Sequence, residues 1–393
     1  MSIYTDNIQD MLADDSKIAI RQLESDAMAG NLEATYLLGK VYYDGVYYPP
    51  NSNKVLGLWE KGAQNGSIDC LRALGDCHFF GFGYEESNEK AMEIYNEVLR
   101  KSPNDHQALC QIGRMHGHGW GVTKNISYAI ALLEDAWKKG SGRAATEIGL
   151  LYMFDMEKNV ENIKEEDVEM GIEMLKRAID AGCAEATGTL ATLYLQGEKV
   201  PTNERLAINY IKQGADMGNS VAMGKMASVY LYGSYGVQDN RIALEWAQKA
   251  AKLGDPLGME CLAVIYDDGI DVYRNPMQAA HWYREVLNHE PENTFCMYRL
   301  AVCLADPFEE FNLHPGYGML EEAYFWACKG VEKGDLDCHM LVAWFYEMGN
   351  VVNQDYDMAY KYFRIAADNG HEMSAELIKR YRKNIFGNYY IPQ

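Results

Sequence analysis

The chain has 393 residues, and its 57 aspartate and glutamate residues outnumber 36 lysine and arginine residues, for a net charge of −21. Because phosphate binding needs a basic surface, this charge argues against a nucleic-acid partner, and it equally disfavours an anionic membrane surface. Apolar residues make up 48% of the chain, which excludes wholesale disorder.

The first residues, MSIYTDNIQDML, lack the basic start of a signal peptide. Apolar runs stay far below the ~20 residues that cross a membrane. Nine cysteines occur without a CxxC pair, so we expect small buried thiols in a reducing compartment and no zinc site. These features predict a cytoplasmic protein with no membrane insertion.

A block that ends in a helix and a glycine recurs along the chain, mostly at intervals of 36 residues. Glycine adopts the left-handed conformation at little cost, so each of these glycines is predicted to cap the C-terminus of a helix. They are Gly30, Gly66, Gly140, Gly182, Gly218, Gly254, Gly334 and Gly370, and Ser102 and Glu290 occupy the same register, each followed by proline.

The chain opens with a helix predicted over residues 17–29, and each later period contains two helices, A and B. Helix A follows the cap glycine and carries glycine or alanine at a fixed position, as in residues 32–44 and 68–80. Helix B carries a small residue with a large one four positions later, as in Ala91 and Tyr95. This spacing places these residues on one helical face. The small residue of helix A lets the partner helix approach, and an aromatic residue three positions later on the same helix, such as Tyr42, is expected to fill the space above it.

Two periods are longer than the others because they carry insertions between helices A and B, at residues 155–167 and 306–318. We expect both insertions on the same edge of the fold. The acidic residues Glu165–Asp167 are predicted to lie in a solvated loop. After the last cap glycine, residues 374–383 are predicted to form a helix that turns basic and covers the final repeat.

A single helix–turn–helix unit cannot bury its apolar face, so the units are predicted to stack into an all-α solenoid. Residues 1–30 would form an N-terminal cap and half repeat, residues 31–370 nine repeats, and residues 371–393 a C-terminal capping helix and tail. This organisation is one elongated unit, whereas chain length alone suggests two or three domains.

The repeat unit is clearest in residues 221–254 and 336–370. In both units helix A carries an alanine followed three residues later by tyrosine, and helix B ends in A-A-x-x-G. These features resemble the Sel1-like repeat family, a relative of the tetratricopeptide repeat, whose pattern is L-G-x-x-Y, then G-x-G-V, and A-x-x-W-Y-x-x-A-A-x-x-G. The resemblance implies a right-handed α/α superhelix with helix A on the concave side, and an adaptor or scaffold role. Secreted relatives have a disulfide between cysteines eight residues apart, whereas Cys328 and Cys338 are ten apart, which argues against a disulfide-stapled form.

Ser87 and Lys90 match the S-x-x-K motif of penicillin-binding enzymes, an activity linked to secreted relatives of this family. The motif needs S-D-N and K-T-G partners, which the chain lacks, and a helix N-cap explains Ser87 better. The glycine-rich segments 81–83 and 117–121 are interpreted as structural turns and not as phosphate loops.

Three histidines, His78, His116 and His118, raise the alternative of a metal site. His78 and His116 stand where the family has tyrosine, so packed rings are favoured over ligands. We therefore expect no enzyme activity, no cofactor and no metal.

By analogy with tetratricopeptide repeats, the concave groove is predicted to be partly basic near the N-terminus and acidic near the C-terminus. Aromatic and arginine side chains are common interface hot spots. The alternative for each residue is packing between adjacent A helices. The groove candidates are Tyr36, Lys40, Tyr43, Arg72, Asp76, Phe79, Arg114, Arg143, Met340 and Trp344.

The sequence therefore predicts a non-enzymatic scaffold, monomeric or weakly oligomeric, that binds a protein or peptide in its groove. The net charge favours a basic partner. One alternative is a regulatory or immunity-type inhibitor with a single tight partner. A second alternative is a hydrolase like the secreted relatives, which would require an acyl-enzyme on Ser87.

Overall fold

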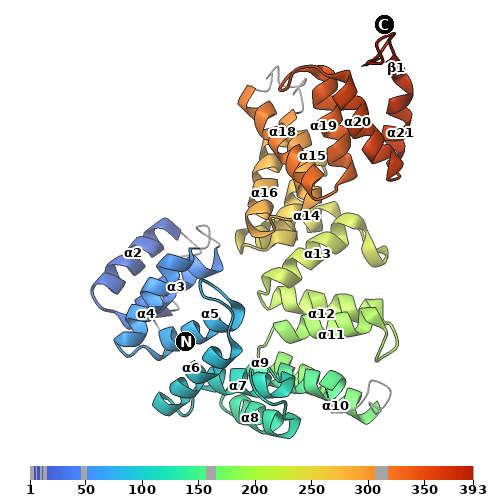
Figure 1. The fold of residues 1–393 in the computed structure, drawn as a ribbon. Coiled ribbons are helices and arrows are strands. Elements are labelled where there is room, and N and C mark those ends of the chain that lie inside the picture. Colours follow the sequence, from blue (N-terminus) through green and yellow to red (C-terminus); the bar gives the residue numbers. More distant parts are fainter. Residues whose placement is uncertain are drawn as a thin grey trace. The chain divides into compact units, whose positions relative to one another are not determined.

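The computed structural model describes residues 4–5, 7–8, 11, 16–45, 51–155, 165–305 and 317–392. The regular secondary structure of the described residues is almost entirely helical, which confirms the predicted all-α solenoid of helix–turn–helix repeats (Figure 1). None of the described helices has the length and apolar character needed to cross a membrane. The chain divides into two compact units, Met1–Ala222 and Met223–Gln393.

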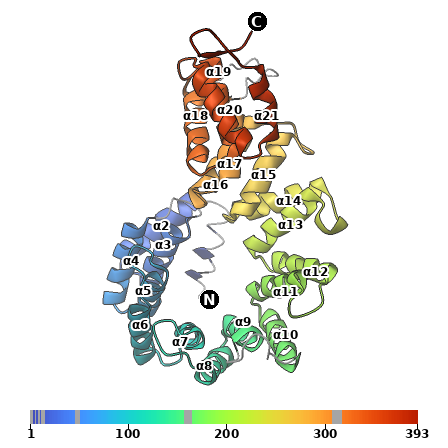
Figure 2. The ribbon, with the colours of Figure 1, turned by 45° about the vertical axis from the view of Figure 1, so that its right-hand side comes forward.

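The first unit consists of helices that alternate between the predicted A and B types, and consecutive helices α2 to α6 lie side by side (Figure 2). The A-type helices are α3 Leu32–Asp44, α5 Ile68–Phe80, α7 His106–His118, α9 Gly142–Leu150 with the π-helical turn η1 Leu151–Asp155, and α11 Glu185–Gln196. The B-type helices are α2 Ser16–Met28, α4 Ser52–Gln64, α6 Asn88–Lys101, α8 Ile126–Lys138, α10 Glu165–Asp180 and α12 Glu204–Asp216.

The second unit continues the alternation, and helix α13 Ser220–Tyr232 contains the division between the units. The other A-type helices are α15 Pro256–Asp268, α17 Thr294–Ala305, α19 Leu336–Met348 and α21 Glu372–Leu377. The B-type helices are α14 Asn240–Lys252, α16 Pro276–His289, α18 Tyr317–Glu332 and α20 Tyr356–Asp368. Short 3-10 turns are η3 Ser234–Gly236 and η5 Ile378–Arg380, and strands β1 Arg382–Lys383 and β2 Tyr389–Tyr390 pair antiparallel.

The turns between helix B and the next helix A have the predicted chemistry. All eight cap glycines have positive φ angles, between 82° and 103°. Most following A helices begin at a polar N-cap, such as Ser67, whose side chain accepts a hydrogen bond from the Cys70 backbone N–H. The left-handed glycine lets the chain turn so that backbone carbonyls at the end of helix B are hydrogen-bonded, and the side-chain cap accepts from free N–H groups at the start of helix A. These two features fix where each helix ends and the next one begins.

The small residue of helix A is the site of closest approach to helix B, as predicted. A Cβ atom at Gly39 would overlap the indole of Trp59, and one at Gly75 would lie 2.7 Å from Tyr95 Cε1. Both rings are buried. The ring that covers the small residue therefore belongs to helix B and not, as expected, to the aromatic three residues later on helix A. Glycine is required because the ring occupies the space of a side chain.

Two sequence expectations are wrong. Glu165–Asp167 form the first turn of α10 and not a loop, where carboxylates are favoured by the helix dipole. In place of the helix expected over residues 374–383, α21 ends at Leu377, the 3-10 turn η5 continues to Arg380, and Arg382–Lys383 pair with Tyr389–Tyr390 as strands. The buried Tyr381 stops the helix, because its hydroxyl donates to Glu347 Oε2 at 2.6 Å from an extended backbone.

The two inserted loops lie largely outside the described residues, which omit 156–164 and 306–316. Their position on a common edge stays a prediction. The division of residues 31–370 into nine repeats between two caps also stays a prediction.

Substitution of Gly39 by alanine tests the helix contact. We expect Gly39→Ala to lower the free energy of unfolding by about 1–3 kcal/mol, because the added methyl group overlaps the buried Trp59 ring. The matched control is Gly57→Ala in α4, where no described atom lies within 4 Å of the added Cβ. That variant should gain up to about 1 kcal/mol from helix propensity. Urea denaturation measures both, and equal stability of the two variants would contradict the packing argument.

Candidate functional site

Three A helices of the first unit, α5, α7 and α9, are joined by a network of ion pairs and hydrogen bonds. Arg72 on α5 donates through Nη1 to Asp105 Oδ2 and through Nη2 to Asp69 Oδ1, both at 2.7 Å. Asp105 is the N-cap of α7, so this pair joins two successive A helices. The Arg72 side chain is only 9% exposed, and this predicted groove residue is therefore committed to the framework.

The network continues along α5, α7 and α9. Asp76 Oδ1 accepts from the Tyr95 hydroxyl at 2.6 Å and from Gln111 Nε2 at 2.9 Å. Arg114 donates to Gln111 Oε1 at 2.7 Å, and its Nε lies 2.7 Å from Glu147 Oε1 in an ion pair. The predicted groove residues Asp76 and Arg114 thus belong to one lateral network.

Glu147 is the anionic end of this network and is buried. Burial alone would raise the pKa of its carboxyl group. The hydrogen bond with His118 and the positive charges of Arg114 and Arg143 outweigh burial and hold the pKa below its ordinary value. Glu147 is therefore ionised at neutral pH and neutralises the arginines.

The predicted aromatic residues of the groove pack against other rings. Tyr36 stacks on Trp59 with ring centroids 6.2 Å apart, and Tyr43 lies 5.5 Å from the same indole. Phe79 packs edge-on against Trp120 at 5.3 Å. All three predicted residues remain partly exposed, so each offers part of a ring to the surface.

The remaining four predicted groove residues are exposed or half-buried. Lys40 and Arg143 are exposed on α3 and α9, and Trp344 on α19 is 40% exposed. Met340 on α19 is half-buried. With Arg72 and Arg114 paired to carboxylates, the expected basic character of the N-terminal groove is reduced to Lys40 and to the exposed Arg143, whose Nε lies 3.9 Å from Glu147 Oε1. Whether these residues bind a partner stays a prediction.

The second unit contains a network of the same design. Arg299 on α17 lies 2.8 Å from Asp267 Oδ2 and donates through Nε to the Tyr283 hydroxyl at 3.2 Å. Tyr283 occupies the same register on α16 that Tyr95 occupies on α6. In both units an aspartate of one A helix therefore meets a buried helix-B tyrosine and a polar residue of the next A helix.

The residues considered for catalysis or metal binding have structural roles. Ser87 is the N-cap of α6 and accepts from the Lys90 backbone N–H at 3.2 Å, while Lys90 Nζ pairs with Glu93 at 3.1 Å. This confirms the N-cap interpretation. The His78 ring stacks on Tyr84 at 4.1 Å, and the His118 ring stacks on Trp120 at 4.3 Å.

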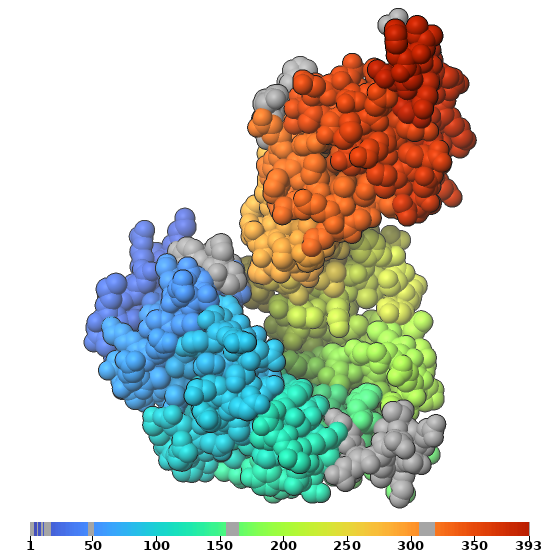
Figure 3. Space-filling view, viewed as in Figure 1, coloured from blue at the N-terminus to red at the C-terminus, as the bar shows by residue number. Residues whose placement is uncertain are grey.

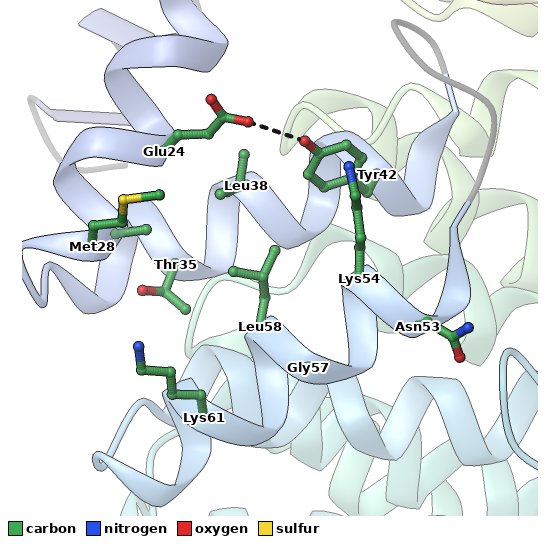
Figure 4. Close-up of a pocket in the computed structure, with 11 residues that line it drawn as sticks. Glu24, Met28, Thr35, Leu38, Tyr42, Asn53, Lys54, Gly57, Leu58 and Lys61 are labelled. Atoms are coloured by element: carbon green, nitrogen blue, oxygen red, sulfur yellow. Dashed lines mark hydrogen bonds between the residues drawn. The ribbon is translucent and has the colours of Figure 1, made fainter.

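An apolar pocket of about 340 Å³ opens between α2, α3 and α4 (Figure 4). Met28, Leu38 and Leu58 line it, and Lys54 and Lys61 lie at its rim. The sequence analysis did not identify this pocket. Its signal is a set of departures from the repeat pattern, which become visible only when the repeats are compared position by position.

A second feature that sequence reasoning missed is the strand pair at the end of the second unit. It projects beyond the helices (Figure 3), and at its turn Ile385 is 93% exposed and Phe386 is 82% exposed. The pair is held by stacking of Tyr389 on Tyr360 at 3.7 Å.

The family model described as Sel1 repeat matches eight segments that together cover most of the chain. They are residues 32–67, 68–97, 106–141, 143–183, 187–219, 220–255, 257–285 and 336–371. The chain belongs to the Sel1 repeat family. The expected family resemblance is thereby confirmed.

Curated Sel1 relatives match only a short part of the chain. Human "Protein sel-1 homolog 2" is 32% identical over 79 residues, and the Arabidopsis thaliana "ERAD-associated E3 ubiquitin-protein ligase component HRD3B" is 29% identical over 79 residues. Each match covers 20% of this chain, but only 11% and 13% of the respective relative.

Solved structures of Sel1 type match more of the chain at lower identity. A protective antigen of uropathogenic Escherichia coli has a TM-score of 0.46 and 21% identity, and covers 91% of this chain and 81% of its own. A Sel1 repeat protein from Oxalobacter formigenes has a TM-score of 0.43 and 22% identity, over 65% of this chain and 99% of its own.

The Glu147 ion pairs predict a pH-dependent stability. Because the folded pKa is lowered, the stabilisation is present above the unfolded value of about 4.3 and is lost as the pH falls through the folded pKa. We expect Glu147→Gln to cost on the order of 3 kcal/mol at pH 7, because Arg114 loses its buried counter-charge. The difference from the wild type should shrink below about pH 4.

Denaturant unfolding at several pH values measures this effect. The control is Glu173→Gln, which removes an exposed pair with Arg177 (3.0 Å, both side chains half-exposed) and should cost less than about 1 kcal/mol. A Glu147→Gln penalty that does not change between pH 7 and pH 3.5 would contradict the assigned ionisation.

Proposed function

We propose that this Sel1 repeat chain is a non-enzymatic scaffold that binds a protein or peptide through the exposed side chains of its A helices. The observation that carries the proposal is that some polar and aromatic side chains of these helices are paired within the fold and others are exposed. Arg72, Asp76 and Arg114 are paired within the framework, whereas Lys40 and Trp344 are left exposed. A rigid framework that presents such side chains is suited to contacts with a partner.

The state of the thiols supports a role without covalent catalysis. Eight of the nine cysteines are buried and Cys328 is half-buried. Burial raises the pKa of Cys70 to about 11 and that of Cys261 to about 12. These thiols are therefore protonated at neutral pH and poor nucleophiles.

A relative's name also supports participation in a protein assembly, since HRD3B is named as a component of a ubiquitin-protein ligase. For this chain, the net charge of −21 would accelerate encounter with a basic partner, and this steering would weaken with salt. The exposed Lys40 and Arg143 would contact carboxylates locally.

Site-specific photo-crosslinking tests the binding face. A photoreactive amino acid at Lys40 or Trp344 should give adducts with a restricted set of proteins in extracts of the source cells. The same group at Lys252, exposed on the B-type helix α14, is the control and should not capture that set. Equal capture at all three positions would contradict binding through the A helices.

The captured protein, once purified, allows a quantitative measurement. We expect Trp344→Ala to weaken its binding by about tenfold or more, as removal of an aromatic hot spot does. Several unrelated partners would indicate a scaffold, and one stoichiometric partner would indicate the regulatory-inhibitor alternative. An unchanged affinity would remove Trp344 from the binding surface.

A further inference from the structure

We propose that the pocket between α2, α3 and α4 is a docking site for a partner peptide that inserts one large apolar side chain beside a carboxylate. This proposal deepens the proposed function by naming a class of partner. It concerns a different surface, formed between two B helices and one A helix, so the two proposals can fail independently.

The pocket has the size and lining of an apolar side-chain site. Its volume is about 340 Å³, whereas a cavity of about 150 Å³ already accommodates benzene. Met28 from α2, Leu38 from α3 and Leu58 from α4 turn toward the space (Figure 4). Met28 is 84% exposed, so its thioether side chain is free to close over an inserted group.

Met28 is an exception among the repeats. It lies two residues before the cap glycine, and every equivalent position in the other repeats is polar or charged. The equivalent residues are Gln64, Arg100, Lys138, Asp180, Asp216, Lys252, Asn288, Glu332 and Asp368. At this position Met28 joins Leu38 and Leu58 in one continuous apolar lining, and a contiguous apolar surface of this kind is typical of a binding site.

Gly57 is the second exception. It lies in the middle of α4, where glycine costs about 1 kcal/mol relative to alanine. No described atom lies within 4 Å of a Cβ built on it, so no helix contact requires glycine here. The equivalent residues all carry a Cβ: Arg21, Glu93, Ala131, Glu173, Asn209, Glu245, His281, Phe325 and Lys361. Its absence enlarges the pocket.

The charges at the rim select the chemistry of the occupant. Glu24 accepts from the Tyr42 hydroxyl at 3.3 Å, and Lys54 Nζ lies 4.5 Å from the centre of the Tyr42 ring. The ammonium group of Lys61 has no ion-pair or hydrogen-bond partner among the described residues. One glutamate and two lysines leave a net positive rim in an acidic chain. An apolar group with an adjacent carboxylate complements this arrangement.

Fluorescence anisotropy with synthetic peptides tests the site on the full chain. The probe is a short labelled peptide with a central leucine flanked by aspartates. One comparison peptide replaces the leucine by serine, and another replaces the aspartates by lysines. We expect saturable binding of the first peptide, and binding weakened by about tenfold or more for both others.

Two variants locate the binding in the pocket. Gly57→Leu fills the open space, improves helix propensity and should weaken binding by about tenfold or more. Lys61→Glu reverses the free rim charge and should weaken binding by about fivefold at low salt and less at high salt. The controls are Asn209→Leu and Lys249→Glu, at the equivalent positions of other repeats, and both should bind as the wild type does.

Several outcomes would overturn the proposal. They are no binding of the acidic leucine peptide, equal binding of the lysine peptide, or binding that Gly57→Leu leaves unchanged. Octanoate distinguishes a small amphiphile from a peptide: if it binds the pocket and the peptide does not, the docking proposal is wrong. The two proposals are separated by their results. If the acidic leucine peptide binds the pocket while photo-crosslinking at Lys40 and Trp344 captures no protein, the pocket proposal stands and binding through the A helices is wrong.

Discussion

The contact between the small residue of helix A and the large residue of helix B is the constraint on which the rest of the structure depends. Where Trp59 covers Gly39 and Tyr95 covers Gly75, the ring occupies the volume of the missing side chain. This contact sets the distance between the paired helices, and thereby the position of the next A helix. Only with that spacing fixed can polar side chains from successive A helices meet at hydrogen-bonding distance.

The lateral networks follow from this spacing and change the meaning of the polar residues. Tyr95 takes part in both the packing between helices A and B and the lateral network, because its ring packs on Gly75 and its hydroxyl donates to Asp76. Arg72 and Arg114 carry charges that would attract an acidic ligand, but each is paired to a carboxylate within the fold. The ion pairs of the framework therefore neutralise the charges that a groove would otherwise present. Binding is left to the residues outside the networks.

Much of the fold could be predicted because its causes repeat within one period. The cap glycines, the small and large residues and the Ser87 cap depend on neighbours close in sequence or in register. The pairing of groove residues could not be predicted, since Arg72 and Asp105 are 33 residues apart and belong to different repeats. The C-terminal strands were missed because the Tyr381 contact with Glu347 has no counterpart in the earlier repeats.

The pocket was missed for a related reason. It depends on two departures from the repeat pattern: Gly57 lacks a side chain, and Met28 replaces a polar residue. A periodic pattern identifies residues that every unit needs for folding, so it says little about residues that one unit alone requires. Gly57 weakens its helix without serving any described contact, and Met28 exposes an apolar side chain where other repeats place a polar one. Gly57 lowers the stability of its helix, Met28 adds exposed apolar surface, and both border the same space. The described residues show no contact that accounts for either feature, and an apolar group bound in the pocket would account for both.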